Sequence, residues 1–297
     1  STFAVDGSQI YPSKDINPPI ALIQVGWFEN PHLELGSYEK DVRLNIMTPV
    51  ELQMERNGYP LERMVAMRRF EMEVERLIEY IESRAGCSDC LVFFDGSLVA
   101  TFAEAFDADC RAFYAQQFVN LLRASEQYRV PVVGYIDTSH ACDLIQMVQR
   151  LEVVPETTTL IDSQLINPGM EWGDRTPLFV CDRPGDAWGS GILSEYAEQA
   201  SAITFLYLKA NQNAPVRLEM PRWIYEAGLL EKVLDYVRGE IMIGNGYPYV
   251  IETADQVAVL QAEDRQLFYR LLQDWAQAND LQFSFSRKMV SKVLRRR

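Results

Sequence analysis

The tripeptide Asp-Gly-Ser occurs at residues 6–8 and again at residues 95–97, and both times it follows a short apolar run. The runs at 2–5 and 91–94 are rich in branched and aromatic residues, which predicts two buried strands that each end at the aspartate. A carboxylate at the end of a buried strand needs a partner, a turn or a cation, because burying an isolated charge is costly. Asp-Gly is also a common turn pair, but its repetition at two strand ends favours a functional role.

The segments around these motifs predict an antiparallel meander followed by alternating helices and strands. Strands at 20–28 and 37–47 follow the first one, and a long helix runs from about 60 to 83. The apolar residues of this helix recur at helical spacing: Met64, Met67, Val74, Ile78 and Ile81. Gly7-Ser8 is expected to end the first strand, since glycine permits a sharp turn.

The rest of the chain continues the alternation and becomes helical towards its end. The predicted elements are a strand at 91–95, a helix at 107–127, strands at 130–136, 202–208 and 216–220, helices at 223–237, from 254 (capped by Thr253) and at 263–278, and a basic terminal helix. This pattern predicts an α/β fold, a mixed sheet flanked by helices with a helical C-terminal extension. No repeat or flexible linker interrupts it, so residues 1–297 are expected to form one domain.

Two more acidic residues are candidates for the same site. Glu71 lies within the apolar stripe of the long helix, three residues before Val74, so it is expected to face the sheet. Glu75 is the reserve at the edge of that stripe, whereas Glu73 is expected to point away; a surface pair of Glu71 with Arg68 is the alternative.

Asp255 is the fourth candidate and is expected one residue into a late helix. As a single feature, an acid at that position is more often an N-terminal residue that favours the helix dipole.

Carboxylates from two strand ends and a helix face make an oxygen-rich site that suits Mg²⁺ or Mn²⁺. Two such ions activate a water and stabilise a leaving oxygen in phosphoryl chemistry, without a histidine or a covalent intermediate. The order of strand aspartate, meander, helix glutamate and strand-end aspartate is that of an RNase H-like fold.

The chain resembles the NurA nucleases, which partner HerA-type hexameric DNA translocases in DNA-end processing. The resemblance rests on the two Asp-Gly-Ser strands and on later segments at residues 175–179, 205–209, 216–221 and 247–259. It implies that Asp6, a helix glutamate (Glu71) and Asp95 ligate the metal and that the late-helix position completes the catalytic set. That position is histidine in some relatives and Asp255 here, and aspartate binds a hard cation but cannot act as an imidazole.

The function expected from this resemblance is a Mn²⁺- or Mg²⁺-dependent deoxyribonuclease that acts in DNA-end resection and double-strand break repair. The expected partners are DNA, a HerA-type hexameric ATPase and a second copy of the chain in a homodimer. Two alternatives stay open: a non-catalytic adaptor subunit of the translocase, and an RNase H-fold nuclease that acts on RNA or branched DNA.

Charge and composition limit the other possibilities. The chain carries 42 acidic and 28 basic residues, a net charge of −14, which is the wrong sign for a protein that coats nucleic acid. Six of the basic residues and none of the acidic ones lie at 281–297, so residues 1–280 carry −20. This basic tail is either a solvated helix end or a docking element for phosphates or a partner.

The remaining signals exclude several kinds of site. No apolar run is long enough to span a membrane and no secretion signal is visible, so a cytoplasmic protein is expected. Residue 1 is serine and not methionine, so we expect that residues upstream of it have been removed. Cys87 and Cys90 lack a second ligand pair for zinc, and two free thiols are expected. Ser8 and Ser97 have no histidine close in sequence to activate them.

Overall fold

The computed structural model describes residues 1–32, 37–54, 59–153, 155, 159–182, 191–280 and 284–285. The strands in these ranges are β1 (Thr2–Ile10), β2 (Ile16–Asn17), β3 (Ala21–Asn30), β4 (Glu39–Met47), β5 (Leu91–Asp95), β6 (Val132–Ile136), β7 (Phe179–Val180), β8 (Ile203–Leu208), β9 (Val216–Pro221) and β10 (Ser284–Phe285). The α-helices are α1 (Pro49–Met54), α2 (Leu61–Ser83), α3 (Ala108–Tyr128), α4 (Asp143–Arg150), α5 (Asp162–Ile166), α6 (Arg222–Glu226), α7 (Leu230–Ile243), α8 (Tyr249–Ala258) and α9 (Ala262–Ala278). Short 3₁₀ helices are η1 (Thr101–Ala105), η2 (Asn167–Gly169) and η3 (Ile192–Ser201).

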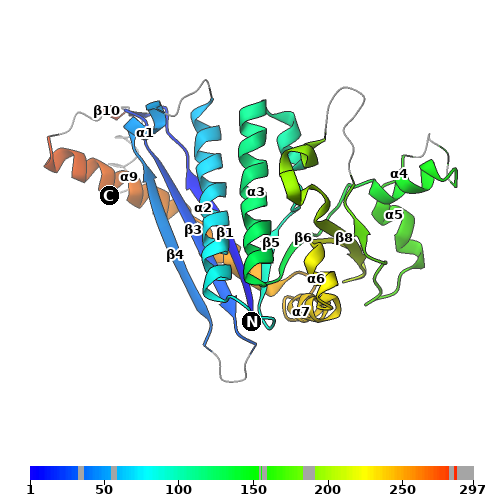
Figure 1. Ribbon diagram of the computed structural model, residues 1–297. Helices are drawn as coiled ribbons and strands as arrows, with labels where there is room; N and C mark the ends of the chain where they lie inside the picture. The colour runs from blue at the N-terminus through cyan, green and yellow to red at the C-terminus, as the bar shows by residue number, and fades with distance from the viewer. Residues whose placement is uncertain are drawn as a thin grey trace. The chain divides into compact units, whose positions relative to one another are not determined.

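Eight strands form one mixed sheet in the order β4-β3-β1-β5-β6-β9-β8-β7 (Figure 1). Strand β5 runs parallel to both β1 and β6, whereas β9 pairs antiparallel with β6 and β8. Parallel neighbours need crossover connections. The connection from β1 to β5 passes through β2, β3 and β4 and ends with the long helix α2, and α3 connects β5 to β6. The predicted mixed sheet flanked by helices, with a helical C-terminal part, is confirmed.

The chain divides into two compact units. The first comprises residues 1–5, 28–39 and 74–254, and the second comprises residues 6–27, 40–73 and 255–297. Strands β1 and β3 and helix α2 each contribute residues to both units. The expectation of a single domain stays a prediction.

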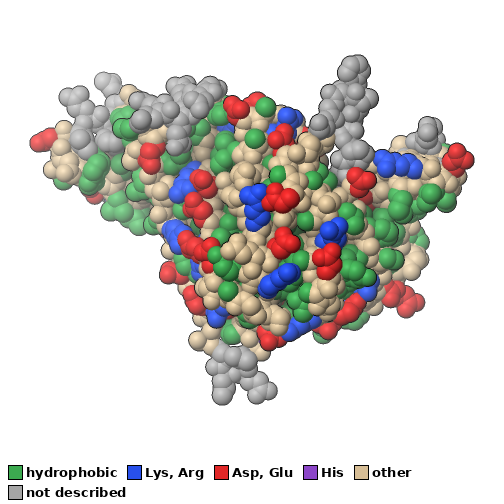
Figure 2. Space-filling view, viewed as in Figure 1, with side chains coloured by type: hydrophobic (Ala, Val, Ile, Leu, Met, Phe, Trp, Pro, Cys, Tyr) green, Lys and Arg blue, Asp and Glu red, His purple; other side chains and the backbone are tan. Residues whose placement is uncertain are grey.

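The first unit buries both faces of its central strands. On one face Phe94 of β5 packs edge-on against Phe118 of α3, and on the other Phe93 and Val133 join a cluster with α7 and α8. Strands that are covered on both faces consist of consecutive apolar residues, which explains why polar and apolar residues do not alternate from Leu91 to Phe93. Acidic and basic side chains are interspersed on the surface of α3, where Figure 2 shows red and blue atoms side by side.

The second unit has a smaller core between strand residues and α9. Ile10 and Leu22 pack with Phe268 and Leu272. Residues four positions apart lie about one helical turn apart, so Phe268 and Leu272 share the buried face of α9.

Several predicted boundaries differ from the structure. Strand β1 continues through Gly7-Ser8 to Ile10, so Asp6 lies inside the strand and not at its end. The helix predicted at 223–237 is interrupted at Gly228, whose φ of +71° suits a residue without a side chain, and α8 begins at Tyr249, so Thr253 is internal to it. The predicted terminal helix lies outside the described residues except for Ser284–Phe285, which pair with β2.

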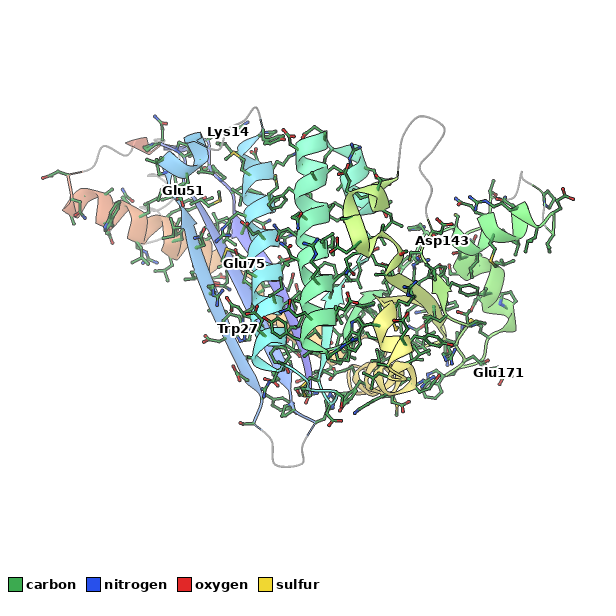
Figure 3. The ribbon with its side chains drawn as sticks, in the orientation of Figure 1. Lys14, Trp27, Glu51, Glu75, Asp143 and Glu171 are labelled. Atoms are coloured by element: carbon green, nitrogen blue, oxygen red, sulfur yellow. A yellow bond between two sulfur atoms is a disulfide. The ribbon has the colours of Figure 1, made fainter. Side chains whose placement is uncertain are left out.

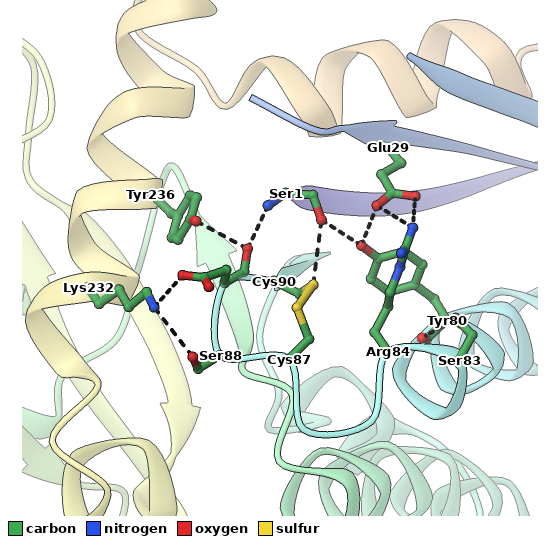
Figure 4. Close-up of a disulfide and its surroundings, with 11 residues drawn as sticks. Ser1, Glu29, Tyr80, Ser83, Arg84, Cys87, Ser88, Cys90, Lys232 and Tyr236 are labelled. Carbon is green, nitrogen blue, oxygen red and sulfur yellow. Dashed lines mark hydrogen bonds and ion pairs between the residues drawn. A yellow bond between two sulfur atoms is a disulfide. The ribbon is translucent and has the colours of Figure 1, made fainter. Parts of the chain in front are cut away.

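Cys87 and Cys90 form a disulfide in the loop that precedes β5 (Figure 4), so the expectation of two free thiols is wrong. Polar contacts around the disulfide tie this loop to α7. Lys232 of α7 forms an ion pair with Asp89, and the Tyr236 hydroxyl donates to the Asp89 carbonyl oxygen at 3.1 Å.

None of the helices in the described part of the chain combines the length and apolar character needed to cross a bilayer.

Candidate metal centre

Asp6 and Asp255 are in direct contact. Asp6 lies half-buried in β1, and its side chain is hydrogen-bonded to that of Asp255, an exposed residue of α8. Burial raises the pKa of Asp6 to about 6, and the neighbouring Asp255 carboxylate contributes to the rise, against the lowering effects of the Gly7 amide and Arg69. Two carboxylates this close repel each other when both are ionised, and a bound cation would offset that repulsion.

Asp255 reaches this position from well inside its helix. It is the seventh residue of α8 and not the second, so the alternative role as an N-terminal helix acid is wrong. Neighbouring contacts hold the helix end against the strands of its own unit: Ser8 and Gln24 donate hydrogen bonds to the carbonyl oxygen of Ala258 at 2.5 and 3.0 Å.

The helix glutamate that packs against β1 is Glu73. Its exposed fraction is 9%, and its Oε1 atom occupies the space that a Cβ on Gly7 would need. The Arg69 guanidinium donates to the Gly7 carbonyl oxygen at 2.8 Å and lies 3.4 Å from Glu73 Oε1. Gly7 is therefore required for close approach between strand and helix rather than for a turn.

The expectation that Glu73 points away from the sheet is wrong. The buried stripe of α2 passes through Phe70, Leu77 and Tyr80, and Glu73 lies three residues after the first of these and four before the second. This spacing is visible in the sequence. The stripe predicted through Met67, Val74 and Ile78 shares Val74 with the buried face, which is wider than predicted and extends to Glu73.

The side chains of Glu71 and Glu75 are more exposed to solvent than that of Glu73. The Glu71 side chain is 33% exposed and pairs with Arg68 at 2.6 Å, the surface arrangement considered as the alternative. Glu75 is exposed on α2 (Figure 3). A ligand role for Glu71 stays a prediction, and the burial of Glu73 makes it the stronger candidate.

Asp95 ends β5, as predicted, and belongs to the first unit. Its Oδ1 atom accepts a hydrogen bond of 2.9 Å from the hydroxyl of Tyr247. Burial raises the pKa of that hydroxyl, and the adjacent Asp95 charge raises it as well, so Tyr247 stays a neutral donor. The ring of Tyr247 packs edge-on against Tyr135 of β6, 5.3 Å between centroids, which fixes the donor beside the carboxylate.

The donor chemistry around Asp6 fits a hard divalent cation. Carboxylate oxygens are the ligands that Mg²⁺ and Mn²⁺ prefer, and an ion would balance the charge of the paired acids. Within the described ranges, no three His, Cys, Asp or Glu side chains stand close enough together to hold a metal ion. The structure therefore shows a pair of carboxyl groups, Asp6 and Asp255, and Glu73 held by Arg69 on helix α2.

The fold is similar to that of a solved protein structure. The NurA nuclease from Sulfolobus solfataricus superposes with a TM-score of 0.60 over 94% of this chain and 84% of that one, at 14% sequence identity. Endonuclease V from Ciona intestinalis, in complex with DNA, aligns at 11% identity over 91% of this chain and 86% of that one, with a TM-score of only 0.33. No curated protein matches.

The family follows from the sequence itself. A family model described as the NurA domain matches residues 1–260, which include both Asp-Gly-Ser motifs, Glu73 and Asp255. The chain therefore belongs to the NurA family, a family of nucleases, and the resemblance inferred from its motifs is confirmed.

Proposed function

We propose that this protein is a divalent-metal-dependent deoxyribonuclease in which Asp6, Asp95 and a glutamate of α2 hold Mn²⁺ or Mg²⁺ and Asp255 assists. The observation that carries the proposal is the contact between the carboxyl groups of Asp6 and Asp255, with the raised pKa of Asp6, in a chain of a nuclease family. Bound ions would supply an activated water and a stabilised leaving oxygen.

The two aspartates occupy equivalent positions along the strands β1 and β5. Ala4 of β1 lies opposite Phe93 of the parallel strand β5, and Asp6 and Asp95 each follow two residues later along their strands. Successive side chains alternate between faces, so each aspartate shares the face of the paired residue that precedes it.

The residues of this chain have distinct tasks in the proposed reaction. Asp6 and Asp255 provide adjoining negative charge at neutral pH, and Tyr247 orients Asp95 through its hydroxyl. Arg69 neutralises Glu73 and holds it beside β1. A fixed arrangement of ligands lowers the reorganisation that cleavage requires.

A calorimetric Mn²⁺ titration tests the proposal. Wild-type protein is expected to bind Mn²⁺ and cleave DNA, whereas Asp6→Asn keeps the shape of the side chain and loses both properties. Asp235→Asn is the matched control, because Asp235 is an exposed residue of α7 that pairs with Arg238. Absence of Mn²⁺ binding in the wild type would instead favour the non-catalytic adaptor, and cleavage of RNA or branched DNA in preference to linear DNA would favour the third alternative.

The biological setting is part of the same proposal. We infer action in DNA-end resection and double-strand break repair, in the cytoplasm, with a HerA-type hexameric ATPase and as a homodimer. An exposed apolar row on the sheet-edge strand β4 supports self-association: Val42, Leu44 and Ile46 are 40%, 56% and 50% exposed. Light scattering of wild type and Leu44→Lys tests it, and a wild type that is monomeric at micromolar concentration would contradict it.

A further inference from the structure

The turn that follows Asp95 is held by a buried glutamate from a distant strand. Glu219 of β9 is 1% exposed, and its Oε2 atom accepts hydrogen bonds from the Ser97 hydroxyl at 2.7 Å and from the Leu98 amide at 2.8 Å. Ser97 ends the second Asp-Gly-Ser motif, and Leu98 is the residue after it. A buried carboxylate that accepts two hydrogen bonds from one turn restricts that turn strongly.

Strand β6 lies between β5 and β9, and it has a glycine where the turn after β5 crosses it. Gly134 of β6 lies opposite Glu219 in the ladder, and a Cβ on Gly134 would stand 2.7 Å from the Gly96 carbonyl oxygen and 3.0 Å from Leu98 Cγ. Any other residue at position 134 would therefore push the turn away from β6. Glycine at this position allows the turn after β5 to pass over β6 and reach β9.

Glu219 is itself fixed by a buried cation. Arg217, two residues earlier on β9 and 1% exposed, donates from Nε to Glu219 Oε1 at 2.8 Å and from Nη1 to Asp143 Oδ2 at 2.9 Å. Asp143 begins α4 (Figure 3), and the guanidinium carbon lies 3.8 Å from the centroid of the Phe205 ring. Each charge in this network has a partner, which is the condition under which buried charges are tolerated.

We propose that Glu219, oriented by Arg217, is a positioning residue that fixes the backbone turn after Asp95 and so sets the place of the Asp95 carboxylate. This inference rests on the proposed function, because it assigns Asp95 to the reacting site. Glu219 itself does not touch substrate; it acts through Ser97 and Leu98. Displacements of about 1 Å in a catalytic group can lower a rate by about 100-fold, so a contact of this kind has a measurable effect.

Variants on both sides of the contact test the inference. Glu219→Gln leaves one oxygen to serve Arg217 and the turn, and Ser97→Ala removes the hydroxyl without disturbing Arg217. Both are expected to lower kcat by about 10-fold or more, to weaken Mn²⁺ binding in calorimetry and to speed amide exchange at residues 95–99, with KM for DNA unchanged. Ser97→Thr retains the hydroxyl and is expected to restore all three quantities.

Thr204→Val is the matched control, since the Thr204 hydroxyl donates to the Met220 carbonyl oxygen within the β8–β9 pair and does not touch the turn. If Glu219→Gln fails to fold, Ser97→Ala decides. A wild type that binds Mn²⁺ and cleaves DNA, together with a Ser97→Ala variant of unchanged kcat and Mn²⁺ affinity, would overturn the positioning role alone. A wild type that neither binds Mn²⁺ nor cleaves DNA would overturn the proposed function and the positioning role with it.

Discussion

At the scale of single residues, the Asp6 carboxyl group links stability to pH. Its pKa is about 6 in the folded protein and 3.8 in an ordinary setting, so the folded chain retains a proton that the unfolded chain releases. The resulting stabilisation is fully present below about pH 4 and is lost as the pH rises through about 6. At neutral pH the ionised Asp6 is therefore destabilising in the absence of metal.

We expect Asp6→Asn to be more stable than wild type at pH 7 in a chelating buffer, by on the order of 2 kcal/mol, and to be equal to it near pH 4. Urea unfolding at a series of pH values measures the difference. Asp235→Asn should follow the wild-type curve throughout. A stability gap between Asp6→Asn and wild type that stays constant with pH would contradict the raised pKa.

Glu73 and Glu71 differ in what surrounds them, and a paired substitution distinguishes them. Glu73→Gln is expected to reduce Mn²⁺-dependent cleavage about 10-fold more than Glu71→Gln, because Glu73 is buried beside Gly7 whereas Glu71 forms a partly exposed ion pair with Arg68. Initial rates at saturating Mn²⁺ measure this. Greater damage from Glu71→Gln would identify Glu71 as the helix ligand.

At the scale of secondary-structure elements, the close packing of α2 against β1 depends on the absence of a side chain at Gly7. Gly7→Ala places a Cβ against Glu73 Oε1 and 2.8 Å from Arg69 Cγ. Glu73 can rotate, but Arg69 Cγ is close to the helix backbone and moves less freely. We therefore expect a loss of about 1 to 3 kcal/mol in unfolding free energy.

Gly239→Ala is the control for this change, because nothing lies within 4 Å of a Cβ built on Gly239 of α7. It is expected to raise stability slightly, since alanine favours helix more than glycine does. Thermal unfolding of both variants provides the comparison. Equal effects of the two substitutions would show that α2 does not depend on the space at Gly7.

At the scale of the whole molecule, charge is unevenly distributed along the chain. The basic residues at 287–297 lie outside the described residues, and the 280 residues before the tail carry −20. Exposed ion pairs contribute only about 0 to 1 kcal/mol each, whereas phosphates release counterions when they bind cations. The tail is therefore expected to serve DNA or partner docking more than folding.

Deletion of Arg295–Arg297 is expected to leave the melting temperature and Mn²⁺ affinity nearly unchanged while weakening DNA binding. Each phosphate that the truncated tail no longer neutralises reduces the steepness of log affinity against log salt by about 0.7 to 0.9. Binding measured at several salt concentrations gives the slope for each protein. Identical slopes and affinities for wild type and truncation, or a truncation that does not fold, would assign the tail a structural role.

The sequence by itself determined the strands that carry Asp6 and Asp95, the long helix at 60–83, the α/β class and the family. These features depend on local spacing and on short motifs, which the order of residues records directly. The predictions from sequence are wrong where a residue that is distant in the chain determines the local structure. The Asp-Gly pair predicts a turn at Gly7, but this glycine instead leaves space for the side chain of Glu73.

Only the tertiary structure decided which side chains meet. The buried face of α2 depends on where β1 lies against it, so Glu73 and not Glu71 packs beside Gly7. The contact of Asp6 with Asp255 joins residues 249 positions apart, and that of Ser97 with Glu219 spans 122 positions. Helical and strand periodicity describe neighbours within a few residues, whereas such contacts are fixed by the packing of strands and helices that lie far apart in the chain.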